Sequence, residues 1–179
     1  CSIHAFVTAD KICPIRPCEM LIYRQPGSSV LRYSGASTNW RPSESQSSQM
    51  VQAVTQVGQA LSSEVNYRGS FTLDGICNQA GFFPTEVNPR FGGALGRMSA
   101  ATPGLPILML HHAMASGVAL DYRADELAEL IATEADAIPR LRGMMILDGI
   151  SGIPQASTPI ALRDGTWQVT DDEDGAQGK

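Results

Sequence analysis

The stretch that decides the fold is residues 67–93, which read YRGSFTLDGICNQAGFFPTEVNPRFGG. Alternation of apolar and polar residues from Phe71 predicts one strand, Gly81 marks its end, and alternation around Glu86 and Asn88 predicts the returning strand. Side chains two positions apart on a strand project to the same face. Glu86 and Asn88 are therefore expected on one side of a hairpin.

Asp74 lies on the first strand of this hairpin, twelve positions before Glu86. A side chain on the partner strand can lie opposite its neighbour at cross-strand distance, so Asp74, Glu86 and Asn88 are expected to bring three oxygen atoms together. Magnesium prefers oxygen ligands, takes one or two carboxylates from protein, and is completed by water and nucleotide phosphates. Two carboxylates and an amide suit a nucleotide-bound metal better than a closed structural site.

The run EVNPR that begins at Glu86, with Asp74 upstream and Arg68 opening the hairpin, resembles the metal-binding end of the ATP-grasp fold of carboxylate–amine ligases. The resemblance implies that Asp74, Glu86 and Asn88 are metal ligands. It also implies that Arg68 and Asn88 contact the nucleotide, and that Arg90 is the catalytic residue that stabilises the transferred phosphoryl group or the acyl phosphate.

The same resemblance implies Mg²⁺ or Mn²⁺ as the metal and ATP as a co-substrate. The reaction would join a small carboxylic acid to an amine, one of them an amino acid or peptide, through an acyl-phosphate intermediate. The implied fold is α+β, the C-terminal subdomain of an ATP-grasp domain, with a mostly antiparallel sheet and flanking helices.

The segments around the hairpin support this fold. Apolar residues that recur at steps of three and four predict a helix that begins near Ser43; they are Met50, Val54, Val57, Leu61 and Val65. The apolar run from Ile107 to Met114 predicts a short hydrophobic helix after the hairpin. Further strands are predicted at residues 2–8, 18–24 and 29–33. Residues 34–48 are predicted to be a loop, in which Gly35 and Trp40 could line a substrate site.

The chain is expected to divide into three parts. Residues 1–116 form the partial ATP-grasp domain, and residues 117–170 form a small α+β region. That region has a helix at 124–137 and strands at 144–147, 159–163 and 166–170. The acidic tail, residues 171–179, is expected to be disordered.

The beginning of the chain reads directly as a strand, and no Gly-rich phosphate loop precedes it. The only lysines are Lys11 and Lys179, whereas the family holds its nucleotide with lysines ahead of this strand. The chain is therefore expected to be a fragment of a larger ligase, incomplete and inactive alone, whose partner is the missing N-terminal part of the same enzyme.

Composition narrows the function classes. With 43% hydrophobic and 17% charged residues among 179, the chain can bury one core and a small appendage. A net charge of −5 disfavours nucleic-acid binding, and no apolar run is long enough for a membrane span or a signal peptide. The four cysteines lack zinc-ribbon spacing, so reduced thiols and a cytoplasmic location are expected.

Other interpretations of the sequence stay open. The hairpin could be a polar strand face without chemistry. Cys1 could be the nucleophile of an amidohydrolase that uses its own α-amino group as the base, or the chain could be a noncatalytic binding module with the ATP-grasp fold. His4 could face the nucleotide cleft, while His111 and His112 in an apolar helix are a poor metal site and better read as satisfied helix histidines.

Overall fold

The computed structural model describes residues 1–24, 27, 29–121, 123–137, 141–143, 160–163 and 166–169. It divides into two compact units, Cys1–Gly143 and Met144–Lys179, and each is described by itself. The first unit contains a sheet in the strand order β5-β4-β1-β2-β3-β6, in which all neighbouring strands are antiparallel. Its strands are β1 (Ser2–Val7), β2 (Ile12–Arg24), β3 (Leu31–Ser37), β4 (Gly69–Asn78), β5 (Gly81–Asn88) and β6 (Leu141–Gly143).

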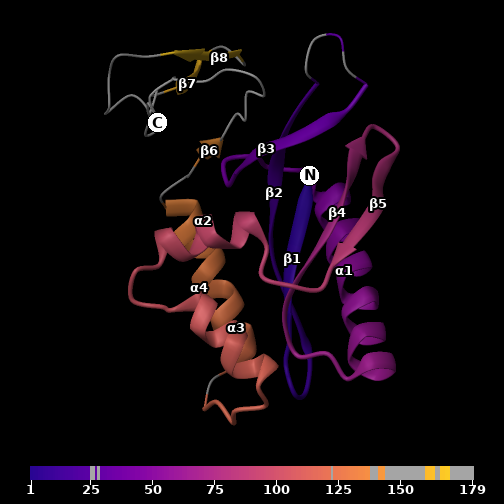
Figure 1. Cartoon of the computed structure of the whole chain (residues 1–179), viewed down its shortest axis with the longest axis vertical. Coiled ribbons are helices and arrows are strands. Elements are labelled where there is room, and N and C mark those ends of the chain that lie inside the picture. The colour runs from indigo at the N-terminus through magenta and orange to yellow at the C-terminus, as the bar shows by residue number, and fades with distance from the viewer. Residues whose placement is uncertain are drawn as a thin grey trace. The chain divides into compact units, whose positions relative to one another are not determined.

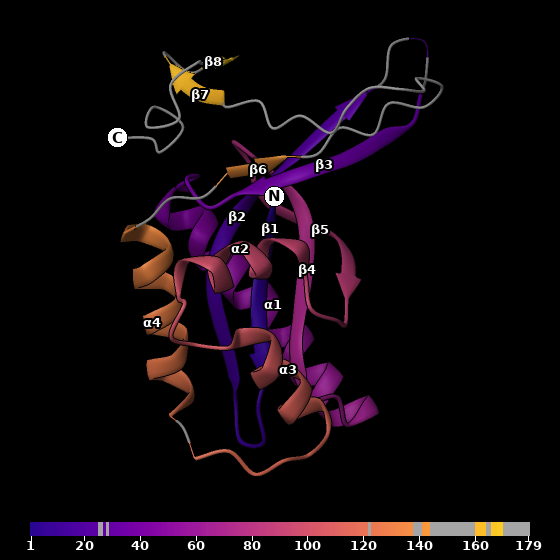
Figure 2. The ribbon, with the colours of Figure 1, turned by 60° about the vertical axis from the view of Figure 1, so that its left-hand side comes forward.

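Helices cover both faces of this sheet (Figures 1 and 2). Helix α1 (Glu44–Val65) packs on one face, and α2 (Gly93–Ala101), α3 (Ile107–Ala115) and α4 (Ala124–Ala137) pack on the other. Helix α1 begins where it does because Ser43 and Gln46 form a capping box, in which each side chain bonds the other residue's backbone N–H. No helix in the described part of the chain is both long and apolar enough to cross a membrane.

The alternation along β1 creates two separate hydrophobic cores. Ile3, Ala5 and Val7 point toward α1 and pack with Met50, Val54, Phe71 and Leu73, whereas Phe6 points the other way and packs with residues of α2, α3 and α4. A strand whose two faces are both buried carries apolar residues on both sides. The exception on β1 is the polar pair Ser2 and His4, which is 2% and 1% exposed.

The predicted α+β fold class is confirmed, but some boundaries are wrong. Strand β2 begins at Ile12 instead of residue 18, and β3 continues to Ser37 because its backbone pairs with β2 and β6. The predicted loop 34–48 is therefore shorter, because β3 ends at Ser37 and α1 begins at Glu44. Gly35 lies within β3, and Trp40 packs against the α1 core instead of lining a site.

The C-terminal part of the chain agrees with the prediction where it is described. Helix α4 has the predicted bounds, and β7 (Ile160–Arg163) pairs with β8 (Thr166–Val169) as the predicted hairpin. Helix α4 packs on α2 and β2 and belongs to the first compact unit, which ends at Gly143. The expected boundary was after residue 116. The predicted strand 144–147 and the predicted disordered tail 171–179 lie outside the described residues.

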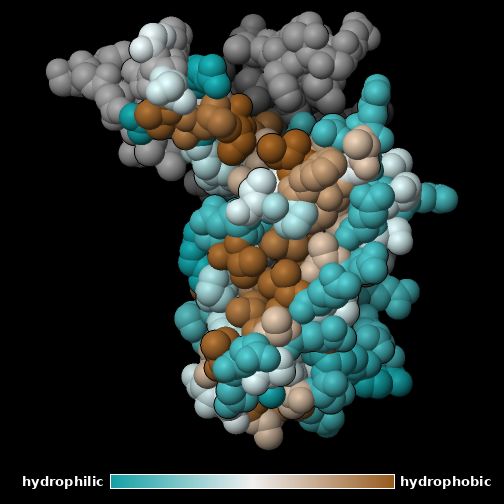
Figure 3. All heavy atoms as spheres, turned by 90° about the vertical axis from the view of Figure 1, so that its right-hand side faces the viewer, coloured by the Kyte–Doolittle hydropathy of each residue, from teal (hydrophilic) through white to brown (hydrophobic). Residues whose placement is uncertain are grey.

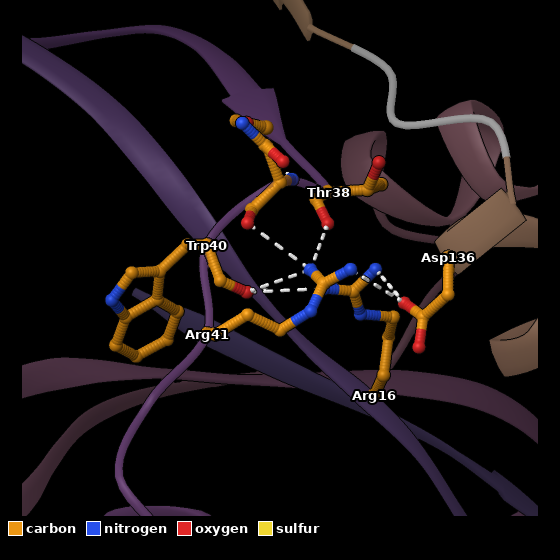
Figure 4. A network of polar contacts seen from close by, with 7 residues as sticks. Arg16, Thr38, Trp40, Arg41 and Asp136 are labelled. Carbon is orange, nitrogen blue, oxygen red and sulfur yellow. Dashed lines mark hydrogen bonds and ion pairs between the residues drawn. The ribbon is translucent and has the colours of Figure 1, made fainter. Parts of the chain in front are cut away.

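A charged network ties the segment before α1 to the end of α4 (Figure 4). Asp136 forms ion pairs with Arg16 of β2 and with Arg41, where the Nη2–Oδ1 distance is 3.2 Å. Arg16 also donates to the Trp40 carbonyl at 3.0 Å, and Arg41 donates to the Thr38 carbonyl at 2.9 Å. The Arg16 side chain is only 9% exposed. Two arginines thus offset the unfavourable acidic charge near the C-terminus of α4.

The face that carries β5 and α1 retains hydrophobic side chains at the surface (Figure 3). Exposed large hydrophobic residues on these elements and on β4 are Val51, Val65, Ile76, Phe83 and Val87. Val65 is 67% exposed, although the predicted apolar stripe of α1 includes it. The buried part of that stripe, Met50 and Val54, therefore makes the larger contribution to packing α1 on the sheet.

Candidate functional site

One cavity of about 420 Å³ brings the hairpin residues together. It lies on the sheet face opposite α1, and its lining includes Asp74 of β4, Glu86 and Asn88 of β5, and Arg90 just beyond. The three predicted oxygen ligands and the predicted catalytic arginine thus share a single cavity. The Asn88 amide presents its nitrogen, and not its oxygen, to Asp74, so the expected convergence of three oxygen atoms is not shown.

The register of the hairpin explains this arrangement. Asp74 pairs directly with Glu86, and Thr72 pairs with Asn88, so the two rungs of the β4–β5 ladder place Asp74, Glu86 and Asn88 side by side. Directly paired residues have Cβ atoms about 4.5–5.5 Å apart. The pairing slips by one residue beyond Asp74, where Thr85 has no partner on β4. This bulge ends the polar part of the hairpin face.

The acidic pair is electrostatically unfavourable without a cation. Burial raises the pKa of the Asp74 carboxyl, and the neighbouring Glu86 carboxylate raises it further. The positive charges of the Cys1 α-amino group and of Arg90, and a hydrogen bond of 2.9 Å from the Asn88 amide nitrogen, lower the pKa by smaller amounts. The proton on Asp74 is therefore held more tightly than usual, which is the condition in which a divalent cation can replace it.

The Asn88 side chain is hydrogen-bonded to Asp74 and to Arg90. Its amide nitrogen donates to Asp74, and its amide oxygen accepts from the Arg90 guanidinium at 3.2 Å. The Arg90 backbone N–H also bonds the Asn88 carbonyl at 2.8 Å, which fixes the tight turn at Pro89. The Asn88 oxygen therefore faces Arg90, and the amide would have to turn over to present that oxygen to a metal beside Asp74.

His4 and Thr72 complete the cavity on the side of β1. They face each other across the β1–β4 ladder, and their Nδ1 and Oγ1 atoms lie 2.8 Å apart. His4 is 1% exposed, and burial lowers its pKa to about 4. Its Nε2 atom has no hydrogen-bond partner in the described structure. His4 therefore adds a neutral imidazole to a cavity that also contains the charged side chains of Asp74, Glu86 and Arg90.

The start of α2 forms another wall of the cavity, where the lining residues are Gly92, Gly93 and Ala94. Gly92 has φ −86°, so close approach, and not a positive φ, requires a glycine here. A Cβ atom on Gly92 would overlap Thr72 Oγ1 and would lie 2.7 Å from His4 Cε1. As N-cap, Gly92 provides no side-chain bond, so the first amides of α2 keep their donor capacity.

Arg68 does not join this cavity. Its Nη1 atom donates to Ser62 Oγ at 2.9 Å and to its own neighbour's carbonyl, Tyr67 O, at 2.7 Å. It lines a separate cavity of about 780 Å³ near the exposed Lys11–Asp125 pair. Asp74 lies five residues beyond Gly69, in the middle of β4, whereas Arg68 precedes the first residue of that strand. The structure therefore does not bring the predicted nucleotide contact Arg68 to the acidic pair.

Cys1, His111 and His112 do not line this cavity. His111 Nδ1 accepts the Ser70 N–H at 3.0 Å, which confirms the satisfied histidine predicted for α3. Among the described residues no group of three or more His, Cys, Asp or Glu side chains is placed to hold a metal, at either the histidines or the acidic pair. Cys1 Sγ lies 3.3 Å from the Gly75 carbonyl, and its α-amino group donates to the same oxygen at 2.9 Å.

Sequence reasoning missed several residues of the cavity, among them Ser2, Met20, Tyr33 and Thr72. The alternation of side chains along a strand predicts that Thr72 shares a face with Asp74, because the two residues are two positions apart. Met20 and Tyr33 come from β2 and β3, where a register shift next to Leu21 sets which side chains face the cavity. Comparison of the chain with protein-family models and with curated proteins finds no match.

Proposed function

We propose that the chain carries the metal- and phosphate-binding part of an ATP-grasp ligase, which joins a carboxylic acid to an amine with Mg²⁺ or Mn²⁺ and ATP. The observation that carries the proposal is the single cavity shared by Asp74, Glu86, Asn88 and Arg90. A hairpin that served only as a sheet edge would have no reason to hold two carboxylates opposite each other beside a guanidinium.

The residues fit a divalent cation. Burial and the neighbouring Glu86 carboxylate raise the pKa of Asp74, and the nearby positive charges and the hydrogen bond from Asn88 offset this rise only in part. A bound cation would remove this repulsion, and the donor set of two carboxylates and an amide oxygen matches magnesium, which takes its remaining ligands from water and phosphate. Asp74, Glu86 and Asn88 would hold the metal, whose charge would neutralise phosphate oxygens during transfer.

The proposed reaction has two steps. The substrate carboxylate attacks the γ-phosphorus of ATP, which releases ADP and forms an acyl phosphate. The amine then attacks the acyl carbon, and the amide forms as phosphate leaves and the amine nitrogen loses a proton. Arg90 can donate two parallel hydrogen bonds to phosphoryl or carboxylate oxygens. The start of α2 adds the positive end of a helix dipole on the same side of the cavity.

The proposal extends to partners and location. A segment other than residues 1–179 would supply the lysines and the loop that cover the nucleotide, and the enzyme would work in the cytoplasm. Its partners would be ATP and a small carboxylic acid and amine, one an amino acid or peptide, without nucleic acid or membrane.

Manganese binding tests the proposal without requiring turnover. The Mn²⁺ resonance in electron paramagnetic spectra measures free metal, and we expect the wild-type chain to bind Mn²⁺. Asp74→Asn and Glu86→Gln should weaken this binding at least about tenfold, because even residues outside the ligand set change metal affinity by that amount. Glu129→Gln, an exposed carboxylate on α4, is the matched control.

Equal Mn²⁺ affinity in the wild type and in Asp74→Asn and Glu86→Gln would contradict the ligand assignment. A loss of affinity in Glu129→Gln as large as in Glu86→Gln would show that net charge, and not the cavity, attracts the metal. Circular dichroism of each variant separates a loss of binding from a loss of folding.

A further inference from the structure

His4 differs from the other polar residues of the cavity because one of its atoms has no partner. Its side chain is buried and lines the cavity, Nδ1 faces Thr72 Oγ1 at 2.8 Å, and the Cε1 edge faces Gly92. Nε2 is left without a hydrogen bond within the described structure. A buried nitrogen without a partner destabilises the folded state, so such atoms call for an explanation.

The cavity provides that explanation. A ligand that enters beside Asp74 and Glu86 reaches the wall that His4 forms, because all three side chains line one cavity of about 420 Å³. Phosphate and carboxylate oxygens are hydrogen-bond acceptors. They therefore select the neutral tautomer with hydrogen on Nε2, in which Nδ1 accepts a hydrogen bond from the Thr72 hydroxyl.

We propose that His4 contacts the ligand of this cavity directly, with its Nε2–H donating to an oxygen atom of the phosphate-bearing ligand held beside Asp74 and Glu86. This inference rests on the proposed function and adds a residue that the hairpin motif does not contain. His4 acts as an uncharged donor, so it selects ligand oxygens by position and not by net charge, whereas Arg90 supplies the positive charge. The Thr72 hydroxyl is the group that orients the imidazole ring.

Nitrogen NMR of the wild-type chain tests the contact. The protein has three histidines, and His111 has Nδ1 occupied as acceptor for Ser70 N–H, which provides an internal reference away from this cavity. The probe is Mg²⁺ together with pyrophosphate, which offers phosphate oxygens without adenine recognition. We expect His4 to carry its hydrogen on Nε2, and this resonance to shift on titration while that of His111 does not.

Two substitutions at His4 distinguish the role of Nδ1 from that of Nε2. Asparagine places its amide near the position of Nδ1, so His4→Asn keeps a partner for Thr72 and removes the distal donor. Glutamine reaches the position of Nε2, so His4→Gln restores the donor. His4→Asn should bind Mg²⁺–pyrophosphate about tenfold more weakly than the wild type, the loss expected for one hydrogen bond to a charged group. His4→Gln should bind within about threefold of it, since the charge-assisted bond remains.

The outcomes distinguish this inference from the proposed function. If Glu86→Gln weakens binding while the His4 resonance stays fixed and His4→Asn binds like the wild type, the His4 contact is wrong and the metal site stands. If the wild type does not bind the probe, or Glu86→Gln binds it equally well, both fail. Detection of hydrogen on Nδ1 in the bound state would also overturn the donor role of Nε2.

Discussion

Gly92→Ala is the perturbation whose effect follows most directly from the structure. A Cβ atom at this position would overlap Thr72 Oγ1 and lie 2.7 Å from His4 Cε1. Neither neighbour can move easily, because His4 and Thr72 are 1% and 5% exposed and bond each other. Gly92 would therefore have to shift, and with it the start of α2.

The expected cost is that of forcing an extra methyl group into a packed interior, about 1–3 kcal/mol of the free energy of unfolding. A smaller loss comes from replacing glycine by alanine at an N-cap, where alanine is disfavoured. Gly96→Ala in the same helix is the matched control, since its Cβ would meet only Phe91 at 3.9 Å. That substitution should stabilise the protein by about 0.5–1 kcal/mol, because glycine is a poor residue inside a helix.

Urea unfolding of both variants measures the difference, which should be about 1.5–4 kcal/mol. The double variant Gly92→Ala, Thr72→Ala should lose less stability than the sum of its single changes, because removal of the Thr72 hydroxyl makes room for the new methyl group. If Gly92→Ala is as stable as Gly96→Ala, the described packing of α2 against β1 and β4 is incorrect.

The remaining predictions concern charged groups. Because folding raises the pKa of Asp74, the stability that this carboxyl contributes is complete below its unfolded-state pKa and is lost as the pH rises through its folded-state pKa. Asp74→Asn should therefore have a higher melting temperature than the wild type at pH 7 without metal. Calorimetry measures this, and an equal or lower melting temperature would contradict the prediction. Because the pKa of His4 is lowered to about 4, wild-type stability in urea should fall by up to about 1.4 kcal/mol per pH unit between pH 6.5 and 4, and His4→Gln should lack this part of the slope. Asp136→Asn removes the charge that pairs with Arg16, which is 9% exposed, and should cost about 1–3 kcal/mol in chemical unfolding; Asp125→Asn, from an exposed pair, should cost under about 1 kcal/mol, and equal effects would refute the distinction.

Much of the fold was predictable because the periodicity is strong where one face is buried. The step pattern through Met50 and Val54 located α1, and the bounds of α4 were predicted correctly. The ends of β2 and β3 were not, since residues 12–17 contain two prolines and residues 34–37 are small and polar. Those residues become strand because neighbouring strands bond their backbones, which is a tertiary effect.

The sequence by itself determined the acidic part of the candidate site. Asp74, Glu86 and Asn88 lie on adjacent strands of one hairpin, so local spacing is sufficient to place them on a common face. Arg90 follows two residues later and is held to Asn88 by a local hydrogen bond.

Only the tertiary structure decided the rest. His4 is 68 positions before Thr72 in the sequence, yet the β1–β4 register makes them direct partners. Arg68 precedes β4 and bonds Ser62, outside the cavity that Asp74 lines, although it is only six residues from Asp74 in sequence. An extended strand rises about 3.3 Å per residue, so nearness along one strand separates side chains in space, while pairing between strands joins residues that are distant in the chain.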